Sequence, residues 1–561
     1  MTSHKRQNLT ISDKEKGLKK ILLLVLASAV FMGAVSCGND DRGSGTGHHY
    51  GAALCGNPES LDPQFADDSA SATVIKNLYS GLVTADEYGN ITCCNAVSYD
   101  ISPDGTVYTF NLRDDNYWYF DKNEDDVIDD DEVFPVTADD YVFALRRVID
   151  PVMQSPYAEY FSCIKGAEKV ISGEIPAENA EIYALDNYTL VIVLESANVE
   201  FLRLMASQAA MPCNRDFFYS TKGRYGLDYR SVMSNGAFYV YQWFYDPYGV
   251  NNILYMRKNK KNQREDFEIS PNYLSFTIEK NENDIRQLFR NGEIECFTTL
   301  DAESYNSRKY TVSSSRSITL GILFNTKTGY FSNPDIRKAF ALTTRKDNLT
   351  YENDDICTAD GIIPPAVTIL GRSYRELSAD SIFRKYDNVE AVELFDRAKK
   401  NAGFDKVKNV RVLVNADTVN SACMESILKE WKDCFDCEIG IEDVSAEDFD
   451  RRISEGGYDI ALYPLTADFS GGISFIKAFE EKDFLKNKLS ETGLSETLMN
   501  CTSINDLVEK YQTAEKLILD EFVFVPLFYK NSYLITGVDN EEIKYDSFSG
   551  AVDYRTAKNY S

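Results

Sequence analysis

Predicted strands and helices alternate along this chain, and that alternation restricts its fold more than any other feature. Residues 410–414 and 438–441 are short apolar runs typical of buried strands, whereas residues 421–431 between them have the spacing of an amphipathic helix. A strand, a helix and a second strand in that order predict a βαβ unit. Because the alternation continues along the chain, we expect an α/β architecture.

Capping residues mark the ends of several predicted helices. Thr137 with Asp140 three positions later has the pattern of a capping box, Asn333 precedes Pro334, and Gly403 follows an amphipathic run. The expected helices are residues 137–148, 333–342, 389–402 and 507–519. The expected strands are residues 106–112, 190–194 and 522–528, the last of them broken by Pro526.

The first 36 residues have the composition of a cleaved export signal. Four lysines (Lys14, Lys16, Lys19 and Lys20) precede an apolar run over residues 21–35. A run of 15 residues is shorter than the roughly 20 that a membrane-spanning helix needs. We therefore expect residues 1–36 to be removed after export. The remainder, more than 500 residues, is too long for a single core and predicts two or three domains.

Cys37 follows the small residues at the end of that apolar run. Ala34-Val35-Ser36-Cys37 resembles a lipobox, in which the cysteine thiol receives a diacylglycerol and becomes the new N-terminus. Ala34 stands where that pattern usually has Leu. The resemblance implies a mature protein exported and anchored by lipid to the outer face of the cell membrane, and a plain transmembrane anchor is the alternative. Residues 37–49 are rich in Gly and polar residues and predict a flexible tether.

Charge and histidine content exclude several functions. The formal net charge is −29, and so acidic a surface repels phosphate backbones, which argues against nucleic acid as a partner. The three histidines are His4, His48 and His49, which lie in the predicted signal and tether. We therefore expect neither histidine-dependent nucleophilic catalysis nor a histidine-ligated metal site in the folded body.

Eleven cysteines follow Cys37, an odd number for an exported chain. Cys93 and Cys94 are adjacent, and Cys434 and Cys437 form a CxxC pattern. A redox motif needs a thioredoxin-like context and a zinc site needs a second pair nearby. The sequence shows neither, so we expect scattered reduced cysteines with occasional pairing.

A series of short motifs resembles the extracellular solute-binding lipoproteins of ABC importers, in the oligopeptide/dipeptide-binding family (family 5). The similarity runs from about Leu61 to the C-terminus. Its motifs are Leu-Asp-Pro-Gln at 61–64, Asn-Leu-Tyr-Ser-Gly-Leu at 77–82, Ile-Ser-Pro-Asp-Gly at 101–105 followed by residues 108–115, Val-Thr-Ala-Asp-Asp at 136–140, Asp-Pro at 150–151, Ser-Pro-Tyr-Ala at 155–158, Ser-Asn-Gly-Ala-Phe at 234–238, Phe-Asn-Thr at 324–326, residues 334–339, Ala-Glu-Lys at 514–516 and Val-Pro-Leu at 525–527. Their number and order make the similarity specific.

The resemblance implies an α/β fold with two lobes, of the periplasmic-binding-protein type II in its large, three-subdomain form, with crossing strands between the lobes. It implies a monomer that closes over its ligand by hinge motion. The expected segments are the signal 1–36, the tether 37–49, a first part of lobe I at 50–90, an extra subdomain at 91–186, a second part of lobe I at 187–310, lobe II at 311–520 and a return to lobe I at 521–561.

The resemblance also implies ligand-binding residues. Asp468, in Ala467-Asp468-Phe469, matches the family's aspartate that pairs with the α-amino group of a peptide. An ionised carboxylate is the natural partner for an ammonium inside a closed cleft. The family usually has Tyr at 469, Trp at 465 and Asp-Pro at 471–472, where this chain has Phe, Leu and Gly-Gly. The other candidates are Asp67, Asp68, Ser69, Tyr157, Asn235, Gly236 and Trp243.

An acidic segment at residues 121–132 fits the spacing of an EF-hand calcium loop. The candidate ligands are Asp121, Asn123, Asp125, the carbonyl of Val127, Asp129 and Glu132. Asp126 stands where Gly normally makes the turn, and the preceding residues 117–120 are predicted to be extended instead of helical. A structural Ca²⁺ and a solvated acidic insertion therefore both remain open, and no other cofactor is expected.

The leading hypothesis is a receptor that binds extended peptides and delivers them to the permease of an ABC importer without catalysis. Peptide backbone groups pair with strand edges in such sites, which gives affinity independent of side-chain identity. One alternative is the same fold with an oligosaccharide or other small solute, since Trp243 and the Tyr-rich segments could stack on a sugar. An exported hydrolase with paired carboxylates is a further alternative.

Overall fold

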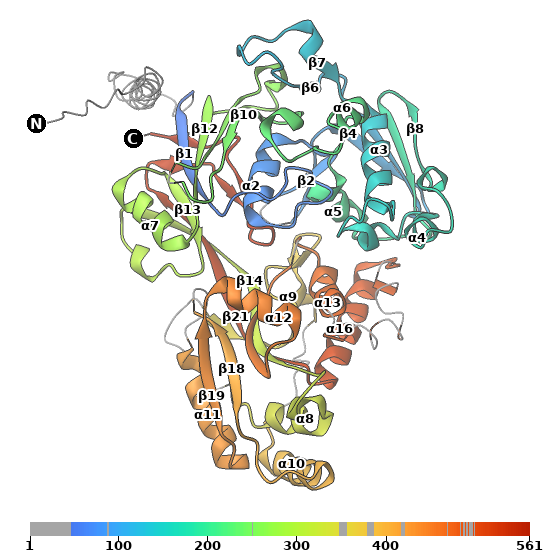
Figure 1. Ribbon diagram of the computed structural model, residues 1–561. Coiled ribbons are helices and arrows are strands. Elements are labelled where there is room, and N and C mark those ends of the chain that lie inside the picture. Colours follow the sequence, from blue (N-terminus) through green and yellow to red (C-terminus); the bar gives the residue numbers. More distant parts are fainter. Residues whose placement is uncertain are drawn as a thin grey trace, which may run out of the picture. The chain divides into compact units, whose positions relative to one another are not determined.

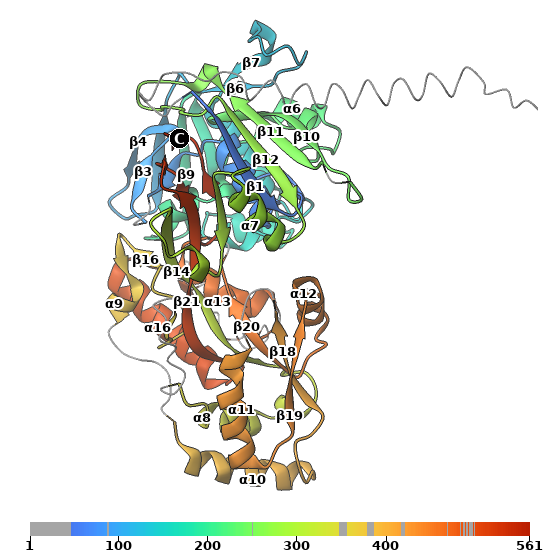
Figure 2. The ribbon, with the colours of Figure 1, turned by 90° about the vertical axis from the view of Figure 1, so that its left-hand side faces the viewer.

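Two long antiparallel strands connect the parts of this molecule. The structure is a computed structural model, and it describes residues 47–86, 89–249, 251–346, 356–378, 386–416, 421–467, 469–482, 484–485, 489, 492, 497–498 and 500–560. Residues 46–559 form one compact unit. The long strands are β14 (Tyr310–Phe324) and β21 (Phe524–Gly537), which are paired from Tyr310↔Gly537 to Leu323↔Phe524 and lie side by side in Figure 2.

Lobe I comprises the described residues before β14 and after β21, and it contains two four-stranded sheets (Figure 1). One sheet has the order β1-β12-β11-β10, and the other has the order β4-β5-β9-β8. The strands of the first sheet are β1 (His49–Cys55), β10 (Phe238–Phe244), β11 (Ile253–Lys258) and β12 (Tyr273–Glu279). Those of the second are β4 (Ala96–Ile101), β5 (Val107–Leu112), β8 (Ile182–Asp186) and β9 (Thr189–Val193).

Short strands and helices complete lobe I. Its paired short strands are β2 (Val83–Ala85), β3 (Ile91–Cys93), β6 (Tyr117–Tyr119), β7 (Val133–Pro135), β22 (Asn540–Glu541), β23 (Lys544–Tyr545), β24 (Val552–Asp553) and β25 (Lys558–Asn559). Its helices are α2 (Ser69–Leu78), α3 (Ala138–Ile149), α4 (Ala167–Ile171), α5 (Phe201–Met205), α6 (Arg215–Ser220) and α7 (Glu282–Asn291).

Lobe II comprises the described residues between β14 and β21, and its sheet is continuous with these two strands. The strand order is β13-β21-β14-β20-β18-β19, with β15 paired to β21. β13 (Cys296–Thr299), which pairs with β21, precedes β14 and therefore belongs to lobe I. The lobe II strands are β15 (Ile356–Thr358), β18 (Val410–Asn415), β19 (Ile439–Val444) and β20 (Ile460–Leu465), and a separate pair is β16 (Thr368–Ile369) with β17 (Arg372–Ser373). The helices are α8 (Pro334–Leu342), α9 (Tyr374–Ser378), α10 (Asn388–Ala402), α11 (Ala422–Phe435), α12 (Ala446–Glu455), α13 (Gly472–Glu481) and α16 (Ile504–Asp520).

Both faces of the lobe II sheet are covered by helices. Val412 and Val414 of β18 belong to the core that contains Ile336 of α8 and Trp431 of α11, whereas Leu413 belongs to the core on the other face. Successive strand residues point to opposite faces. An apolar run without polar alternation is therefore the pattern of a sheet buried on both sides.

The predicted α/β architecture and its βαβ unit are confirmed. β18 and β19 are parallel and α11 connects them. The predicted caps are also present: Thr137 and Asp140 form a capping box, Asn333 caps α8, and Gly403 ends α10 with φ 72°. These ends follow from local chemistry, because the cap side chain or the left-handed glycine satisfies backbone groups that the helix leaves unpaired.

The predicted strand break at Pro526 is wrong. β21 continues through Pro526, which lies opposite Gly321 next to a shift in the β14–β21 register. A Cβ atom on Gly321 would lie 2.7 Å from the Val525 carbonyl oxygen, so the strands approach too closely there for any side chain. Proline, which has no N–H, is tolerated at such an irregularity in the ladder.

The N-terminal boundary of the fold also differs from the expectation. β1 begins at His49, which pairs with Tyr273 of β12, so this histidine belongs to a sheet and not to a tether. Residues 1–36 and Cys37 lie outside the described residues. Within the described part, no helix has the length and apolar character needed to cross a membrane.

Candidate functional site

Two adjoining cavities lie where the lobes meet the crossing strands. The acidic cavity has a volume of about 420 Å³, and the large cavity has a volume of about 790 Å³. Residues of lobe I, lobe II and β14 line both of them. They share seven lining residues: Ala72, Tyr157, Gln208, Tyr545, Ser547, Phe548 and Ser549. We therefore treat them as two ends of one binding groove.

The acidic cavity takes its charge from Asp67, Asp68 and Glu282, and no Lys or Arg is among the described residues that line it. Asp68 is the N-cap of α2, where its carboxylate accepts hydrogen bonds from the Ser71 N–H at 2.8 Å and the Ser71 hydroxyl at 2.5 Å. Asp67 precedes this cap and its side chain is exposed. The helix cap thus fixes the backbone that presents Asp67 to the groove.

Tyr157 stands at the junction of the two cavities. Its hydroxyl donates a hydrogen bond to the Ala66 carbonyl at 2.5 Å and accepts one from Gln208 Nε2 at 2.9 Å. The ring is buried, with 7% of its surface exposed. These contacts hold the wall of the groove in place, and they join the loop before α2 to the segment after α5.

The predicted site residues divide into two groups. Asp67, Asp68, Ser69 and Tyr157 lie together on the groove. Asp468 lies outside the described residues; its neighbour Ala467 lines the acidic cavity and Phe469 lines the large one. The remaining candidates, Asn235, Gly236 and Trp243, line neither cavity.

Asn235 and Gly236 hold the core of lobe I. The Asn235 amide donates to the Ser80 carbonyl at 2.8 Å and accepts from the Ser80 N–H at 3.0 Å. A Cβ atom on Gly236 would lie 2.7 Å from the Leu78 backbone, so only glycine fits. Trp243, on β10, donates its indole N–H to Asn57 at 2.9 Å. Trp243, one of the residues on which the sugar alternative rests, therefore lines neither cavity, whereas Tyr157 and Tyr545 line both.

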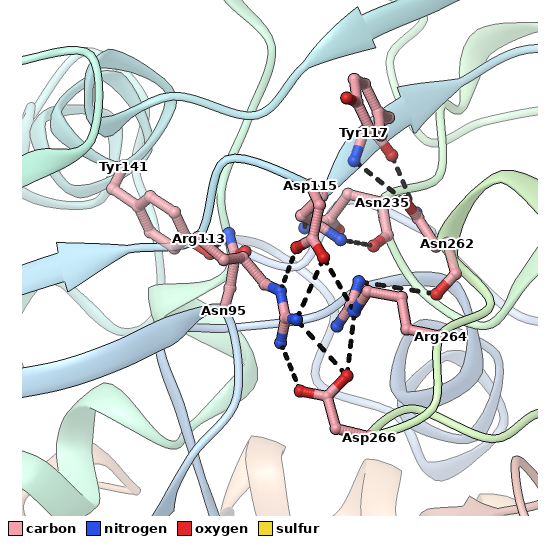
Figure 3. Close-up of polar contacts among 10 residues, drawn as sticks. Asn95, Arg113, Asp115, Tyr117, Tyr141, Asn235, Asn262, Arg264 and Asp266 are labelled. Carbon is pink, nitrogen blue, oxygen red and sulfur yellow. Dashed lines mark hydrogen bonds and ion pairs between the residues drawn. The ribbon is translucent and has the colours of Figure 1, made fainter.

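Two arginine–aspartate pairs beside the large cavity are shown in Figure 3. Arg113 donates to Asp115 at 2.5 Å and to Asp266 at 3.1 Å, and Arg264 lies 3.3 Å from Asp266. Burial lowers the pKa of Arg113, but the two aspartates raise it by more, so the net shift is upward. Arg113 and Asp266 line the large cavity. Sequence reasoning included Arg113 in a family motif but gave no sign of its partners at 264–266.

Arg203 was also missed by sequence reasoning, although it joins the two lobes. Its guanidinium donates to the Ser470 hydroxyl at 2.8 Å and to the Thr368 carbonyl at 2.7 Å, both in lobe II. It also lies 3.4 Å from the Glu200 carboxylate. No periodicity or motif marks such a contact, because its partners are more than 160 residues away along the chain.

The acidic segment at 121–132 forms a closed loop of its own hydrogen bonds. Asp121 accepts from the N–H groups of Asp125 and Asp126, and Asn123 and Asp125 each accept from the N–H two residues on. Glu132 accepts from the Lys122 N–H at 2.8 Å and is buried. Among the described residues, no group of three or more His, Cys, Asp or Glu side chains is arranged to hold a metal ion. Calcium binding by Asp121, Asn123, Asp125, Val127, Asp129 and Glu132 stays a prediction.

Comparison with known proteins agrees with this geometry. Residues 92–484 match the model of the bacterial extracellular solute-binding proteins, family 5. The chain belongs to this family. Family 5 consists of binding proteins of importers, so the chain is a solute-binding protein, and the predicted fold class is confirmed.

Relatives cover nearly the whole chain. The oligopeptide-binding protein OppA of Bacillus subtilis is 24% identical over 94% of this chain and 95% of its own, and the dipeptide-binding protein DppE of the same organism is 21% identical over 94% and 96%. Among solved structures, Listeria monocytogenes OppA bound to peptide has a TM-score of 0.72 at 22% identity, covering 91% of this chain and 99% of that one. Haemophilus influenzae OppA in complex with RPPGFSPFR has a TM-score of 0.70 at 20% identity, covering 92% and 99%. These structures share the fold of this family member.

Proposed function

We propose that this family member is a lipid-anchored receptor that binds peptides in the two-cavity groove and delivers them to an ABC importer. The observation that carries the proposal is the acidic cavity, which Asp67 and Asp68 line and which no Lys or Arg in the described part of the chain lines. A protonated α-amino group supplies the missing positive charge. Relatives named as oligopeptide- and dipeptide-binding proteins support the choice of peptide.

The two ends of the groove differ in chemistry, which suits an extended peptide. The ammonium binds at the acidic cavity, which Ala467 lines, and the peptide continues past Tyr157 into the large cavity. Ser313, Ser314 and Ser315 of β14 line that cavity and offer hydroxyl and backbone groups to the peptide. Contacts to backbone groups give affinity for many sequences.

The first experiment identifies the ligand. Mass spectrometry of material that co-purifies with the protein is expected to show a mixture of short peptides. Calorimetry then compares a peptide with its N-acetylated form, and acetylation is expected to weaken binding at least about tenfold because a charge-assisted contact is lost. Asp468→Asn and Asp67→Asn are expected to reduce this discrimination.

A matched control separates the site from general charge effects. Asp539→Asn removes the same charge at an exposed position outside both cavities. It is expected to leave both affinities unchanged. A co-purified glycan, or equal affinity for the free and acetylated peptides, would overturn the peptide proposal.

The anchor is tested separately. Cys37→Ala is expected to abolish incorporation of radiolabelled fatty acid and to release the protein from the membrane fraction. The reason is that the Cys37 thiol is the group that receives the lipid if residues 34–37 are a lipobox. Continued membrane association of the unlabelled variant would show that a transmembrane segment holds the protein instead.

A further inference from the structure

Glycine stands on both sides of one place where the lobes meet. Gly89 of lobe I and Gly371 of lobe II both have left-handed backbones, each with φ 78°. A Cβ atom on Gly89 would overlap the Thr368 hydroxyl of lobe II, and a Cβ atom on Gly371 would lie 2.6 Å from the Asn90 amide oxygen of lobe I. These two approaches are the glycine contacts, and they leave no room for a side chain between the lobes.

Each side of the glycine contacts is held by its own lobe. In lobe I, the Asp86 carboxylate accepts hydrogen bonds from the Asn90 N–H at 2.8 Å and from the Asn90 side-chain amide at 3.0 Å. In lobe II, next to the β16–β17 hairpin, the buried Glu515 carboxylate accepts from the Ile362 N–H at 2.6 Å and from the Tyr374 hydroxyl at 2.8 Å. Because these bonds hold both segments, a side chain added at either glycine is accommodated most readily by separation of the lobes.

The glycine contacts form part of the wall of the large cavity. Asp86 and Gly89 line this cavity from lobe I, and Ala366 and Thr368 line it from lobe II. The Arg203 guanidinium lies at the same place, since it donates to the Thr368 carbonyl at 2.7 Å and its Nη1 atom would lie 3.2 Å from a Cβ atom on Gly89. The wall is therefore complete here only when the two lobes touch.

A peptide chain cannot pass through this wall while the glycine contacts are formed. An extended chain needs about 4.8 Å between its backbone and the backbone of a neighbouring strand. The glycine contacts leave less than the space of one methyl group, so a chain that extended outward here would hold the lobes apart. Such a ligand would be bound without the hydrogen bonds that Arg203 makes to lobe II.

We propose that the glycine contacts limit the length of the peptide, because they form only around a ligand that lies wholly inside the groove. Gly89 and Gly371 are then specificity-determining residues, although neither has a side chain. The inference rests on the proposed function, since it states which peptides the same groove retains. Its ligand class is short peptides, and longer peptides that extend past this wall are bound less tightly.

The first measurement is made on the wild-type protein. Calorimetry compares nested peptides that share one N-terminal sequence and range from tripeptide to dodecapeptide. The affinity is expected to rise until the groove is full and then to fall about tenfold, because the longest peptides prevent closure.

Gly89→Ala tests the contact itself. The added methyl group overlaps Thr368 only when the lobes are closed, so the short peptide that binds best is expected to lose about tenfold in affinity. A dodecapeptide, which does not allow closure, is expected to lose no more than about twofold.

Gly173→Ala is the matched control. Gly173 has φ 77°, and an added Cβ atom would meet no atom of the described residues within 4 Å. The substitution therefore introduces the same backbone strain without a contact between the lobes. It is expected to leave the affinity unchanged at every length.

A double-mutant comparison assigns the loss to the approach of the lobes. Thr368→Ala removes the hydroxyl that the new methyl group meets and keeps the carbonyl that accepts from Arg203. In a Thr368→Ala background, Gly89→Ala is therefore expected to weaken binding of the short peptide by no more than about threefold, instead of about tenfold.

The outcomes separate the two proposals. If peptides bind but the wild-type affinity does not fall at any length up to the dodecapeptide, the length limit is refuted and the peptide receptor stands. The same conclusion follows if Gly89→Ala weakens short and long peptides equally, or weakens neither. If no peptide binds at any length, the proposed function itself fails and takes the inference with it. Because the length series is measured on the wild-type protein, the test holds even where a variant does not fold.

Discussion

The two lobes are joined by a strand ladder and by contacts across the groove, and these connections differ in kind. One is the β14–β21 ladder, a pairing of main-chain groups that runs from Tyr310↔Gly537 to Leu323↔Phe524 with two shifts of register. The other consists of contacts across the groove, which include the ring pairs Tyr160–Phe469 and Phe548–Phe475 and a small set of hydrogen bonds made by residues 196–203 of lobe I. These hydrogen bonds are Ser196 to Asn500 at 2.5 Å, the Val199 N–H to the Cys501 carbonyl at 3.0 Å, and Arg203 to Ser470 and Thr368.

The difference indicates which connection can open. Separating β14 from β21 breaks a row of buried backbone hydrogen bonds, which a folded protein does not tolerate. The contacts of residues 196–203 are a few hydrogen bonds, so they can break at a much smaller cost. We infer that the ladder is the hinge and that the second set holds the closed form, the usual arrangement for hinge closure around a ligand. A ligand that contacts both lobes then adds its own interactions to this set and stabilises the closed form further.

The largest effect is expected from a change that disturbs the ladder. Gly321→Val places a branched side chain where a Cβ atom already lies 2.7 Å from the Val525 carbonyl oxygen and contacts the Phe524 ring. Overpacking of this kind costs about 3 kcal/mol. Urea denaturation followed by the fluorescence of buried Trp431 measures the loss in the free energy of unfolding.

Thr311→Val is the matched control, since Thr311 is exposed on the same strand and adds no volume to the core. It is expected to change the free energy of unfolding by no more than about 0.5 kcal/mol. Equal stability of Gly321→Val and the wild type would show that the strands can separate locally, and the distinction between the two connections would not hold.

A smaller effect, confined to ligand affinity, is expected at the second connection. Arg203→Met with Glu200→Gln removes both hydrogen bonds to lobe II and also avoids leaving a buried charge without its partner. Loss of these contacts shifts the balance toward the open form and weakens peptide binding about tenfold. Calorimetry measures the affinity, and small-angle scattering of the free protein measures the increase in its radius.

Lys165→Met with Glu181→Gln is the control for this pair. These side chains form an exposed ion pair within lobe I, 4.0 Å apart, and line neither cavity. Unchanged peptide affinity is expected. An Arg203 variant that binds as tightly as the wild type would mean that the contacts of residues 196–203 do not hold the closed form.

A region of this molecule could be predicted from the sequence where the interactions that form it are local. The α3 capping box and the Gly403 cap were predicted because their partners lie within a few residues. The break at Pro526 was predicted wrongly because a local rule for proline was applied where the partner strand has glycine at 321. The Arg203 contacts depend on the packing of segments far apart in the chain, and nothing local indicates them.

The same distinction between local and long-range interactions applies to the candidate site. Asp67, Asp68 and Ser69 were found through the family resemblance, and they lie on the groove because the Asp68 cap fixes the start of α2. Asn235 and Gly236 carry an equally distinctive motif, but the motif describes a tight turn in the core of lobe I.

A pH effect is expected at the lobe I end of the ladder. Glu295 accepts a hydrogen bond from the Gly51 N–H at 2.5 Å, and its own carbonyl accepts one from Gly537 at the end of β21. Burial raises the pKa of Glu295 from 4.5 to about 7. The folded state therefore favours the protonated carboxyl, and its stabilising contribution is complete below pH 4.5 and is lost as the pH rises through about 7.

Glu295→Gln keeps a neutral amide that can accept the same hydrogen bond. Between pH 4.5 and about 7, the free energy of unfolding of the wild type is expected to fall relative to that of the variant. Thermal or urea denaturation at several pH values measures it. A difference independent of pH would show that the pKa of Glu295 is the same in the folded and the unfolded state, and the ladder would then have no group at this end that makes its stability depend on pH.

The smallest effect is expected from a single weak contact at the second connection. Ser196→Ala removes the hydrogen bond to Asn500 at a position open to solvent. Water replaces an exposed partner at little cost, so the change in peptide affinity is expected to stay within about twofold, equivalent to about 0.5 kcal/mol. A loss as large as that of the Arg203 variant would show that the contacts of residues 196–203 act as one cooperative unit. The closed form would then open in a single step, because the hydrogen bonds of residues 196–203 could not be broken one at a time.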